Sequence, residues 1–328
     1  MKTRGEKIYS PEEQQDILYN LKENRLMPTK YIYFDFGALK WIKIARSRLN
    51  AQGKGINILE RIMLTQKARA IFDCLPRQNY RNFNLIDLGC GDGSPTYPLL
   101  RHLKQEFPNS QVRYNPIDIS SDMLSIASKN IGRGFEAFGK INRWDFERGP
   151  FKEITKKLYS PNFGNLYMFL GSTFGNMPDL NQTLVNIRKS MNDVDFLLLG
   201  VELLVESEVG TMLREYYDIR DIYDLLFTSL EFFGLKRSSG EFRITFNKKL
   251  SQVECYYIPT KDKTLTTSAG KILLQKAKAI LLARSVKFTP AMISEIASHA
   301  GFRIELLTTS NGNNYALVLL QPLPSNSD

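Results

Sequence analysis

The sequence predicts an α/β fold whose centre is a doubly wound parallel sheet. Two patterns support this prediction. Between residues 83 and 203, short apolar runs alternate with amphipathic segments of helical length, which is typical of a parallel sheet with helices on both faces. Runs such as 83–89 and 194–203 are also apolar almost throughout, as expected of strands that are buried on both faces.

Helices and an aromatic segment precede the predicted sheet. Ser10 stands before a proline and a run of acidic and amide residues, which predicts a helix over 11–23. A segment rich in aromatic and aliphatic residues follows at 27–45, and a glycine-containing loop at 51–57. Helical spacing of apolar residues predicts a further helix over 58–76, which ends at a proline.

The strands and helices of the sheet then follow in alternation. The expected strands are, in order, 83–89, 112–120, a third-strand region at 135–146, 165–172 and 194–203. The expected helices between them are 94–108, 120–131, 150–159 and 177–192. Strand–helix–strand units of this kind bring successive strands into one parallel sheet.

The alternation ends after residue 205. The elements expected beyond it are a long helical stretch over 210–234, two strands within 241–260 joined by a turn at 247–249, a glycine-closed helix over 289–302, and strands at 302–310 and 314–322. The last two strands could complete the sheet as an antiparallel pair.

Composition and charge narrow the class of protein. The 328 residues are 43% hydrophobic and 24% charged, with a formal net charge of +10. No apolar run approaches the roughly 20 residues of a membrane span. No apolar stretch follows the first basic residues, so no signal peptide is expected and a cytoplasmic location is predicted. Lysine and arginine interleave with acidic residues, so nucleic acid is not favoured as a partner.

Cysteine and histidine give no metal-binding or catalytic pattern. Cys74, Cys90 and Cys255 are scattered and form no Cys-x-x-Cys pair, so neither a disulfide framework nor a metal site is expected. His102 and His299 fall in predicted helices away from the motif loops. A histidine general base is therefore not expected.

The most informative segment is LIDLGCGDG at 85–93, where a buried strand runs into glycines and then into a helix. Gly89, Gly91 and Gly93 carry no Cβ, so the backbone there can turn tightly and approach a ligand. The N-terminus of the following helix favours a negatively charged group such as a carboxylate. The spacing lacks the third glycine of the dinucleotide pattern and the Gly-Lys-Ser/Thr of a phosphate-binding loop.

Acidic residues after the next two strands refine the choice of ligand. The second strand ends in Asp118, whose carboxylate can accept hydrogen bonds from both ribose hydroxyls and would repel a 2′-phosphate. The third-strand region ends in Asp145 and Phe146, which could accept from an adenine amino group and pack on its ring. Together with the glycine loop, these positions favour S-adenosylmethionine as the cofactor.

Each of these acids has an alternative interpretation. Asp118 could cap the helix that starts at Ser120, and Asp145 could be a surface turn residue. Asp87, inside the loop segment, could orient the glycine loop or contact the amine of the methionine part through water.

The segment FLGSTFGN at 169–176 resembles a motif of the histidine-specific methyltransferase family, which includes the ergothioneine-pathway histidine Nα-methyltransferase and the fungal dimethylallyltryptophan N-methyltransferase. Further segments are similar to that family in order and spacing, namely KYIYFD at 30–35, NPIDIS at 115–120, LLGVEL at 198–203 and SVKF at 285–288. Tyr217 falls where the family carries a tyrosine that contacts the substrate. The resemblance covers most of the chain.

The resemblance implies a Rossmann-like methyltransferase sheet with an α+β substrate-binding insertion or cap. It implies a cofactor site made by Asp87, Gly89, Gly91, Gly93, Asp118, Ile119, Asp145, Phe146 and Gly171. Asn176 and Tyr217 would position the acceptor amine as the catalytic residues, and Tyr33 and Ser285 would also contact the substrate.

The chain departs from the histidine enzymes of the family in several places. Pro95 stands where the family often has lysine, and Ala283 stands where the histidine enzymes have a glutamate that reads the imidazole. The Tyr-Tyr-Pro-Thr-Arg segment that follows the N-terminal motif is missing. We therefore predict an N-methyltransferase that acts on another small-molecule amine, in an amino acid or an alkaloid-like metabolite.

Other classes of protein compete with this prediction. A nucleic-acid or protein methyltransferase would fit the charge, but the Asn/Asp-Pro-Pro-aromatic element usual after strand four in nucleic-acid enzymes is replaced by GSTFGN at 171–176. A nucleotide-dependent oxidoreductase would fit the sheet but not the glycine spacing. A non-catalytic binding protein on the same fold is a further alternative.

On this interpretation the chain has five parts. They are an N-terminal helical and aromatic segment (1–60) that could act as a substrate lid, a cofactor-binding domain (61–205), a substrate-binding insertion (206–284), a C-terminal completion of the sheet (285–322) and a tail (323–328).

Overall fold

The computed structural model describes residues 3–50, 56–75, 82–132, 139–217 and 219–324. The chain divides into two compact units, each made of two stretches that are distant in the sequence. Unit 1 comprises Met1–Ile44 with Glu206–Val286, and unit 2 comprises Ala45–Val205 with Lys287–Asp328. None of the helices in the described part of the chain has the length and apolar character that a bilayer span requires.

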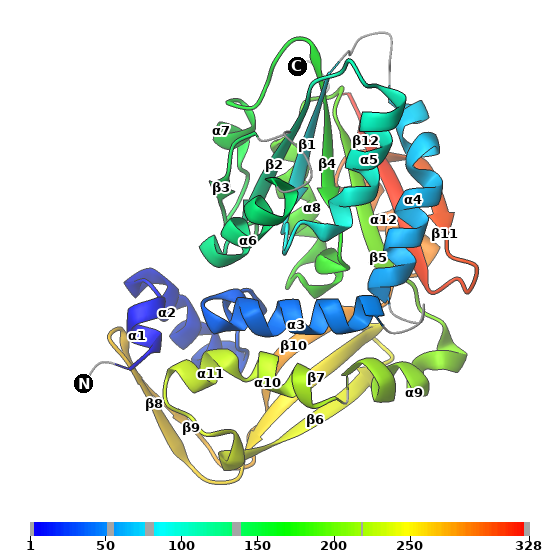
Figure 1. Cartoon of the computed structure of the whole chain (residues 1–328). Helices are drawn as coiled ribbons and strands as arrows, with labels where there is room; N and C mark the ends of the chain where they lie inside the picture. The colour runs from blue at the N-terminus through cyan, green and yellow to red at the C-terminus, as the bar shows by residue number, and fades with distance from the viewer. Residues whose placement is uncertain (1–2, 51–55, 76–81, 133–138, 218, 325–328) are drawn as a thin grey trace. The chain divides into compact units, whose positions relative to one another are not determined.

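Unit 2 is built on a seven-stranded sheet in the order β11-β12-β5-β4-β1-β2-β3 (Figure 1). The strands are β1 (Asn82–Leu88), β2 (Val112–Asp118), β3 (Asn142–Arg143), β4 (Phe163–Phe169), β5 (Phe196–Glu202), β11 (Phe302–Thr309) and β12 (Tyr315–Pro322). Strands β1 to β5 pair in parallel, whereas β12 runs antiparallel to both β5 and β11. The predicted doubly wound sheet and its antiparallel completion are confirmed.

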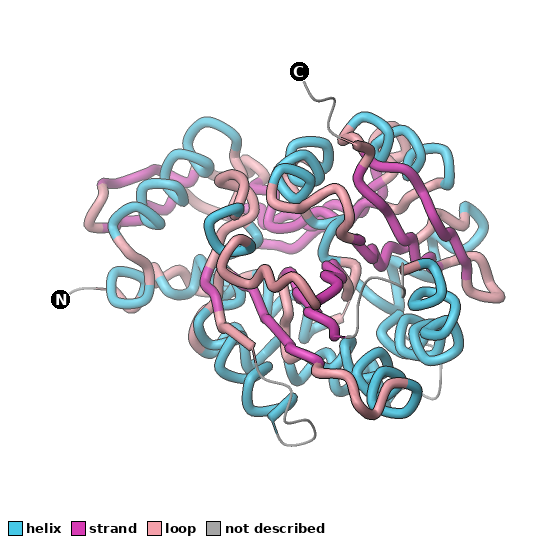
Figure 2. The backbone as a smooth tube through the Cα atoms, turned by 90° about the horizontal axis from the view of Figure 1, so that it is seen from above, coloured by secondary structure: helices cyan, strands magenta, loops and turns pink. Residues whose placement is uncertain are grey.

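Helices flank the strands of this sheet (Figure 2). They are α4 (Ile56–Cys74), α5 (Tyr97–Glu106), α6 (Ser121–Gly132), α7 (Lys152–Thr155), α8 (Leu180–Lys189) and α12 (Pro290–His299). The steps from β1 to β2 and from β4 to β5 run in opposite directions across the sheet, so right-handed connections place α5 and α8 on opposite faces. Buried residues of α4 and α5, such as Leu64 and Leu100, share one core with Leu85 and Leu166 of the strands.

Two elements of unit 2 are shorter than the sequence patterns indicate. Strand β3 contains only Asn142–Arg143, and part of the expected third-strand region lies outside the described residues. Helix α7 contains only Lys152–Thr155, where a longer helix was expected at 150–159, because the chain turns at 156–158 before β4 begins. The edge position of β3 needs few ladder hydrogen bonds, which suits a short strand.

Unit 1 contains short helices, a three-stranded sheet and a hairpin. The helices are α1 (Gly5–Ile8), α2 (Pro11–Tyr19), α9 (Val209–Met212), α10 (Arg220–Leu226) and α11 (Thr228–Phe232), and α3 (Phe36–Asn50) begins in this unit. The sheet has the order β10-β7-β6, with β6 (Gly240–Asn247), β7 (Gln252–Pro259) and β10 (Ile280–Val286), and the hairpin joins β8 (Lys263–Thr267) to β9 (Gly270–Leu274).

The long helical stretch expected over 210–234 is divided into separate helices. Ile219 has extended backbone angles (φ −126°, ψ 144°), which end the π-helical turn Leu213–Tyr217 and precede α10. The helix expected over 11–23 is also divided, because α2 passes into a π-helical turn at Asn20–Asn24. Its start is as predicted, since the Ser10 hydroxyl accepts from the amide of Glu13 in a capping box.

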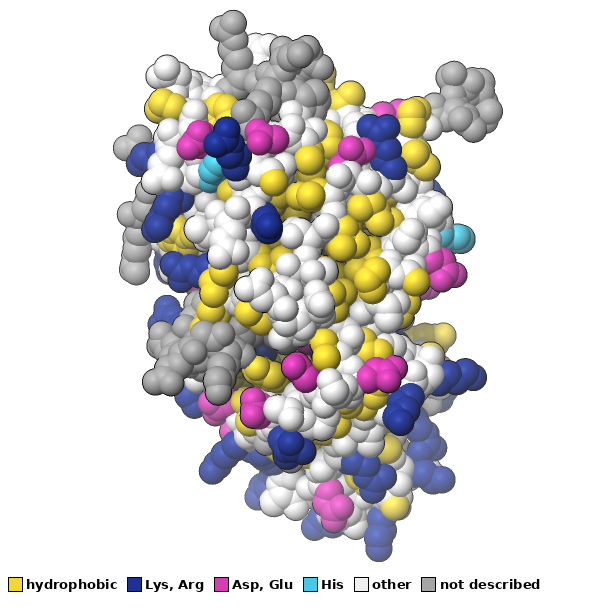
Figure 3. Space-filling view, turned by 90° about the vertical axis from the view of Figure 1, so that its right-hand side faces the viewer, with side chains coloured by type: hydrophobic (Ala, Val, Ile, Leu, Met, Phe, Trp, Pro, Cys, Tyr) yellow, Lys and Arg dark blue, Asp and Glu magenta, His cyan; other side chains and the backbone are white. Residues whose placement is uncertain are grey.

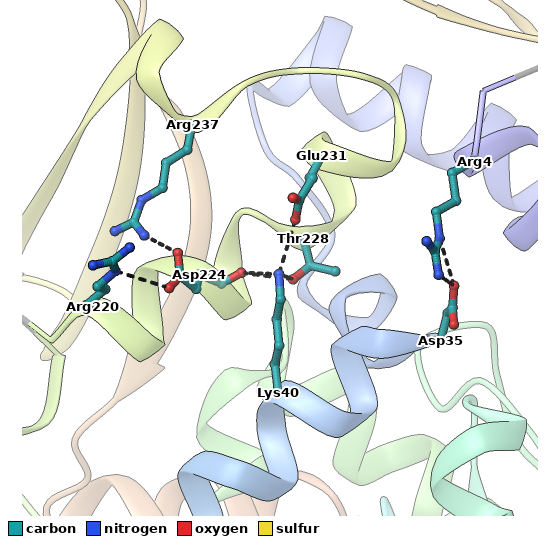
Figure 4. Close-up of polar contacts among 8 residues, drawn as sticks. All are labelled: Arg4, Asp35, Lys40, Arg220, Asp224, Thr228, Glu231 and Arg237. Atoms are coloured by element: carbon teal, nitrogen blue, oxygen red, sulfur yellow. Dashed lines mark hydrogen bonds and ion pairs between the residues drawn. The ribbon is translucent and has the colours of Figure 1, made fainter.

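Polar contacts join α3 to α10 and α11 within unit 1 (Figure 4). The Lys40 ammonium donates to the Asp224 carbonyl oxygen (2.9 Å), the Thr228 hydroxyl (3.0 Å) and the Glu231 carboxylate (3.1 Å). Arg237 pairs with the Asp224 carboxylate. The charges that line the surface hollow beside these helices are thus paired with one another, which indicates a structural role for them.

Candidate cofactor site

The strand order of unit 2 locates a site before any side chain is considered. The order reverses between β1 and β4, so the chain leaves the carboxyl ends of these two neighbours in opposite directions. In open α/β sheets, ligands bind at such a reversal, outside the carboxyl ends of the strands. The loops that follow β1, β2, β3 and β4 carry most of the predicted site residues.

The glycine loop after β1 has the backbone that its sequence predicts. Gly89, Gly91 and Gly93 have φ angles of 62°, 53° and 75°. This is a left-handed backbone conformation that residues other than glycine rarely adopt. A Cβ added to Gly93 would lie 3.1 Å from the Tyr114 hydroxyl. The Gly89 amide donates to the Ile117 carbonyl oxygen (2.8 Å), which holds the loop against the end of β2.

Asp87 lies at the base of this loop and is almost fully buried. Its carboxylate accepts hydrogen bonds from the hydroxyls of Thr96 and Tyr114, each at 2.8 Å. Thr96 follows the glycine loop and Tyr114 lies in β2, so this side chain connects the loop to the neighbouring strand. Burial raises the pKa of Asp87 to about 7, although both hydrogen bonds act in the opposite direction.

Asp118 is the last residue of β2 and is buried beside the glycine loop. Its carboxylate accepts from the Ser120 amide (2.8 Å), and the amides of Gly91 and Ile119 also stabilise its charge. Burial outweighs these hydrogen bonds and raises the pKa of Asp118 to about 6. The half-buried Ile119 follows, and its carbonyl oxygen accepts from the guanidinium of Arg143 (2.7 Å).

Asp145 and Phe146 follow β3. The Asp145 carboxylate accepts from the Glu147 amide (3.0 Å) and pairs with Arg148 at 3.4 Å. The Phe146 ring is buried, with its centroid 5.7 Å from that of Phe169 at the end of β4. The contacts of Asp145 with Glu147 and Arg148 are those of a residue in a turn. The ring of Phe146, next to it in the sequence, lies close to the end of β4.

The loop after β4 contains two consecutive left-handed residues. Gly171 and Ser172 have φ angles of 69° and 58°, and a 3₁₀ turn follows at Thr173–Asn176. Phe174 within this turn stacks on Phe288, with ring centroids 5.6 Å apart. Asn176 closes the turn and is half-buried.

A buried polar cluster supports this loop, and no role is predicted from the sequence for its side chains, which are those of Glu60, Tyr315, Lys287 and Glu202. The Gly171 amide donates to the carboxylate of Glu60 in α4 (2.8 Å), which also accepts from the Tyr315 hydroxyl. Next to them, the ammonium of Lys287 pairs with the carboxylate of Glu202 at the end of β5. One sequence signal could have identified Glu60, because it stands on the apolar stripe of α4 with Met63 and Leu64.

The predicted substrate residues Tyr33, Tyr217 and Ser285 belong to unit 1. Tyr33 ends a 3₁₀ turn and packs edge-on against Trp41, with ring centroids 5.9 Å apart. Tyr217 is the last residue of a π-helical turn and is half-buried. Ser285 is buried in β10, opposite Val253 of β7.

Comparison with known proteins identifies the family. The family described as "Histidine-specific methyltransferase, SAM-dependent" matches residues 13–322. No curated protein matches the chain. Similar solved structures include an S-adenosylmethionine-dependent methyltransferase from Clostridium acetobutylicum ATCC 824, with 11% identity, coverage of 87% of this chain and 99% of that chain, and a TM-score of 0.47. Another is magnesium protoporphyrin IX methyltransferase from Synechocystis PCC 6803, with 12% identity, coverage of 89% and 97%, and a TM-score of 0.47.

The family match spans nearly the whole chain, from α2 to the end of β12. The glycine loop, Asp118 at the end of β2, Asp145 after β3 and the turn after β4 all fall inside the matched residues. The chain therefore belongs to the histidine-specific, S-adenosylmethionine-dependent methyltransferase family and is an S-adenosylmethionine-dependent methyltransferase.

Proposed function

We propose that this enzyme methylates the amine of a small molecule other than histidine, in an amino acid or an alkaloid-like metabolite. The observation that carries the proposal is the turn Thr173–Asn176, which starts two residues after Gly171 and ends in a half-buried amide side chain. A primary amide offers both a donor and an acceptor, so it can orient an amine beside the cofactor.

The residues of unit 2 fit S-adenosylmethionine. Glycines with positive φ leave room for the methionine part, and the buried carboxyl of Asp118 can accept hydrogen bonds from ribose hydroxyls. Asp87, Asp118 and Glu60 are buried acids whose pKa values are raised by burial, and a positively charged ligand nearby would favour their ionised forms. We assign Asp145 and Phe146 to the adenine and Gly171 to the methionine part.

Bound S-adenosylmethionine supplies a methyl group on a sulfonium, and an amine lone pair forms the N–C bond while the C–S bond breaks with its electrons left on sulfur. The protein's contribution is to hold the amine neutral and aligned. We assign Asn176 to orient the amine, and Tyr217 and Tyr33 to face the developing ammonium cation. Ser285 is assigned to the acceptor's side chain. The proton that the amine must lose passes to solvent.

The surroundings of Ser285 support an acceptor other than histidine. Ala283 and Ser285 lie opposite Cys255 and Val253 in the paired strands β10 and β7, so these four side chains share one face of the sheet. Cys255 and Val253 are buried. A small apolar face of this kind is better suited to an apolar acceptor side chain than to a polar imidazole, whose ring nitrogens need hydrogen-bond partners.

The direct test is a panel of primary and secondary amines, with release of S-adenosylhomocysteine as the readout. We expect turnover with an apolar amino acid or an indole-type or alkaloid-type amine to exceed turnover with histidine. Preferred turnover of histidine would overturn the proposed acceptor class. Methylation of RNA, DNA or a protein would overturn the small-molecule proposal.

The charge distribution supports a small-molecule acceptor over nucleic acid. Exposed lysines such as Lys248, Lys249 and Lys261 lie at turns of unit 1. On the face drawn in Figure 3, some acidic side chains stand among the Lys and Arg side chains, which gather toward the lower end of the view. We also propose a cytoplasmic setting, where both the cofactor and metabolite amines are supplied.

Replacing Asn176 with alanine is expected to lower the rate of methyl transfer by about 10- to 100-fold, because the amine loses the group that aligns it. Affinity for S-adenosylmethionine should stay near the wild-type value. Single-turnover kinetics and calorimetry would separate the two effects. Asn181→Ala, at an exposed position in α8, is the matched control. A full-rate Asn176→Ala variant would show that the amide does not align the acceptor.

Affinity for S-adenosylmethionine is expected to rise as the pH increases through the range of about 5 to 8. The raised pKa values of Asp118 (about 6) and Asp87 (about 7) keep part of these carboxyls protonated, and a bound cation favours their charged forms. Binding should therefore release protons. Calorimetry in two buffers with different ionisation enthalpies measures this release. The Asp118→Asn variant should lose the part of the pH dependence near its pKa, and a pH-independent wild-type affinity would contradict the prediction.

A further inference from the structure

Glu60 is a charged side chain in the apolar interface between α4 and the sheet of unit 2. Only 2% of its surface is exposed, and its neighbours along the same helix face, Met63 and Leu64, belong to the apolar core. Moving a carboxylate out of water is costly unless the site stabilises it. The cost suggests that this position has a use beyond packing.

The carboxylate of Glu60 is held from several elements. It accepts from the Gly171 amide after β4 (2.8 Å) and from the Tyr315 hydroxyl at the start of β12. It also lies against β5 at Gly200, where an added Cβ would be 2.5 Å from the carboxylate and would overlap the Tyr315 hydroxyl. Because Gly200 has no side chain, the carboxylate of Glu60 has the space to reach the Gly171 turn.

The charges around Glu60 leave its own charge largely uncompensated. The ammonium of Lys287 pairs with Glu202, and the described hydrogen-bond donors to Glu60 are the neutral Gly171 amide and Tyr315 hydroxyl. The carboxylate of Glu202 acts against the ionisation of Glu60, and the charge of Glu60 in turn raises the pKa of Asp87. Burial and Glu202 together raise the pKa of Glu60 to about 7.

We propose that Glu60 is a positioning residue for the cofactor, which fixes the Gly171 turn and supplies a negative charge that favours S-adenosylmethionine over S-adenosylhomocysteine. The proposal rests on the proposed cofactor site, in which Gly171 contacts the methionine part. That part carries the sulfonium of S-adenosylmethionine, whereas the sulfur of S-adenosylhomocysteine is neutral. A carboxylate beneath the turn would attract the first ligand more strongly than the second.

The Glu60→Gln variant separates charge from geometry. Its amide oxygen can still accept from the Gly171 amide, but the side chain is neutral. At about pH 8, where the wild-type carboxyl is mostly ionised, we expect the affinity for S-adenosylmethionine to fall about tenfold, as the loss of a nearby buried charge predicts. The affinity for S-adenosylhomocysteine should change much less. Glu60→Ala, which also removes the acceptor, should weaken both ligands.

Asp195→Asn provides a matched control. Asp195 is a buried carboxyl of the same unit with a raised pKa, and it accepts from Asn165 (2.9 Å) and from the Asn192 amide (2.8 Å). It precedes β5 and so lies at the opposite end of that strand from Glu202. Its replacement should alter stability and leave the ratio of the two ligand affinities unchanged.

The binding measurements on the Glu60 and Asp118 variants distinguish failure of the role proposed for Glu60 from failure of the cofactor-site assignment. Equal weakening of both ligands by Glu60→Gln, or unchanged binding by Glu60→Ala, would overturn the role of Glu60. If Asp118→Ala weakens binding at the same time, the cofactor site stands. If Asp118→Ala has no effect either, the site assignment fails with it.

If the Glu60→Gln variant does not fold, the proposal can be tested in a protein that keeps Glu60, by varying the pH. The Asp87→Asn protein lacks the other carboxyl with a pKa of about 7. In this protein, the affinity for S-adenosylmethionine should rise relative to that for S-adenosylhomocysteine between about pH 6.5 and 8, as Glu60 ionises. A constant ratio would overturn the proposal.

Discussion

Replacing Asp118 with alanine is expected to weaken S-adenosylmethionine binding by about 1–3 kcal/mol. This is the usual effect when a protein loses a buried acceptor and the polar groups of its ligand are left without a hydrogen bond. The carboxyl is the last side chain of β2 and lies beside the glycine loop. The backbone amides that bond to it keep it in place, so two ribose hydroxyls would meet an acceptor that is already oriented. Isothermal titration calorimetry with S-adenosylmethionine gives the affinity.

Asp122→Ala is the matched control for this experiment. Asp122 is an acid in the first turn of α6, four positions along the chain from Asp118. Its removal should cost some stability, because a negative charge is favourable near a helix N-terminus, and should leave the affinity for the cofactor unchanged. If Asp118→Ala binds like the wild type, the carboxyl is a helix-capping group and the ribose assignment is wrong.

Replacing Lys287 with methionine is expected to lower the free energy of unfolding by about 3–5 kcal/mol, because it leaves a buried carboxylate without its cation. Lys287 is 1% exposed and its partner Glu202 is also buried. The next residue, Phe288, stacks on the turn after β4, so the loss should also loosen that turn. Urea unfolding followed by circular dichroism at neutral pH measures the change.

The double variant Lys287→Met with Glu202→Gln tests whether the charge is the cause. Removing both charges from a buried pair costs much less than removing one, so the double variant should recover most of the lost stability. A single variant that unfolds at the wild-type denaturant concentration would contradict the expected contribution of the pair.

The sequence predicts the centre of this fold well because each signal there is local. Apolar runs separated by segments of helical length predict β1, β2, β4 and β5. The glycines after β1 have the positive φ angles that their spacing indicates. Asp118 could be located because parallel strands end at the same edge of a sheet, so an acid at the end of β2 must lie near the loop after β1.

The supporting contacts could not be predicted, because they join residues that are far apart in the chain. Glu60 and Tyr315 are 255 positions apart and meet only when α4 packs against β12. The combination of 1–44 with 206–286 into one unit likewise has no local signal. Residues 210–234 have a continuous helical pattern, and the break at Ile219 becomes visible only in the backbone angles.

The position of β12 affects how this enzyme can be made in the cell. It is the last strand along the chain, yet it lies between β5 and β11 in the sheet. During synthesis on a ribosome, β5 is completed more than a hundred residues before β12 emerges and presents an open row of backbone donors and acceptors until then. Such an edge is a template for pairing with another nascent chain, so the risk of aggregation during biogenesis is concentrated on β5.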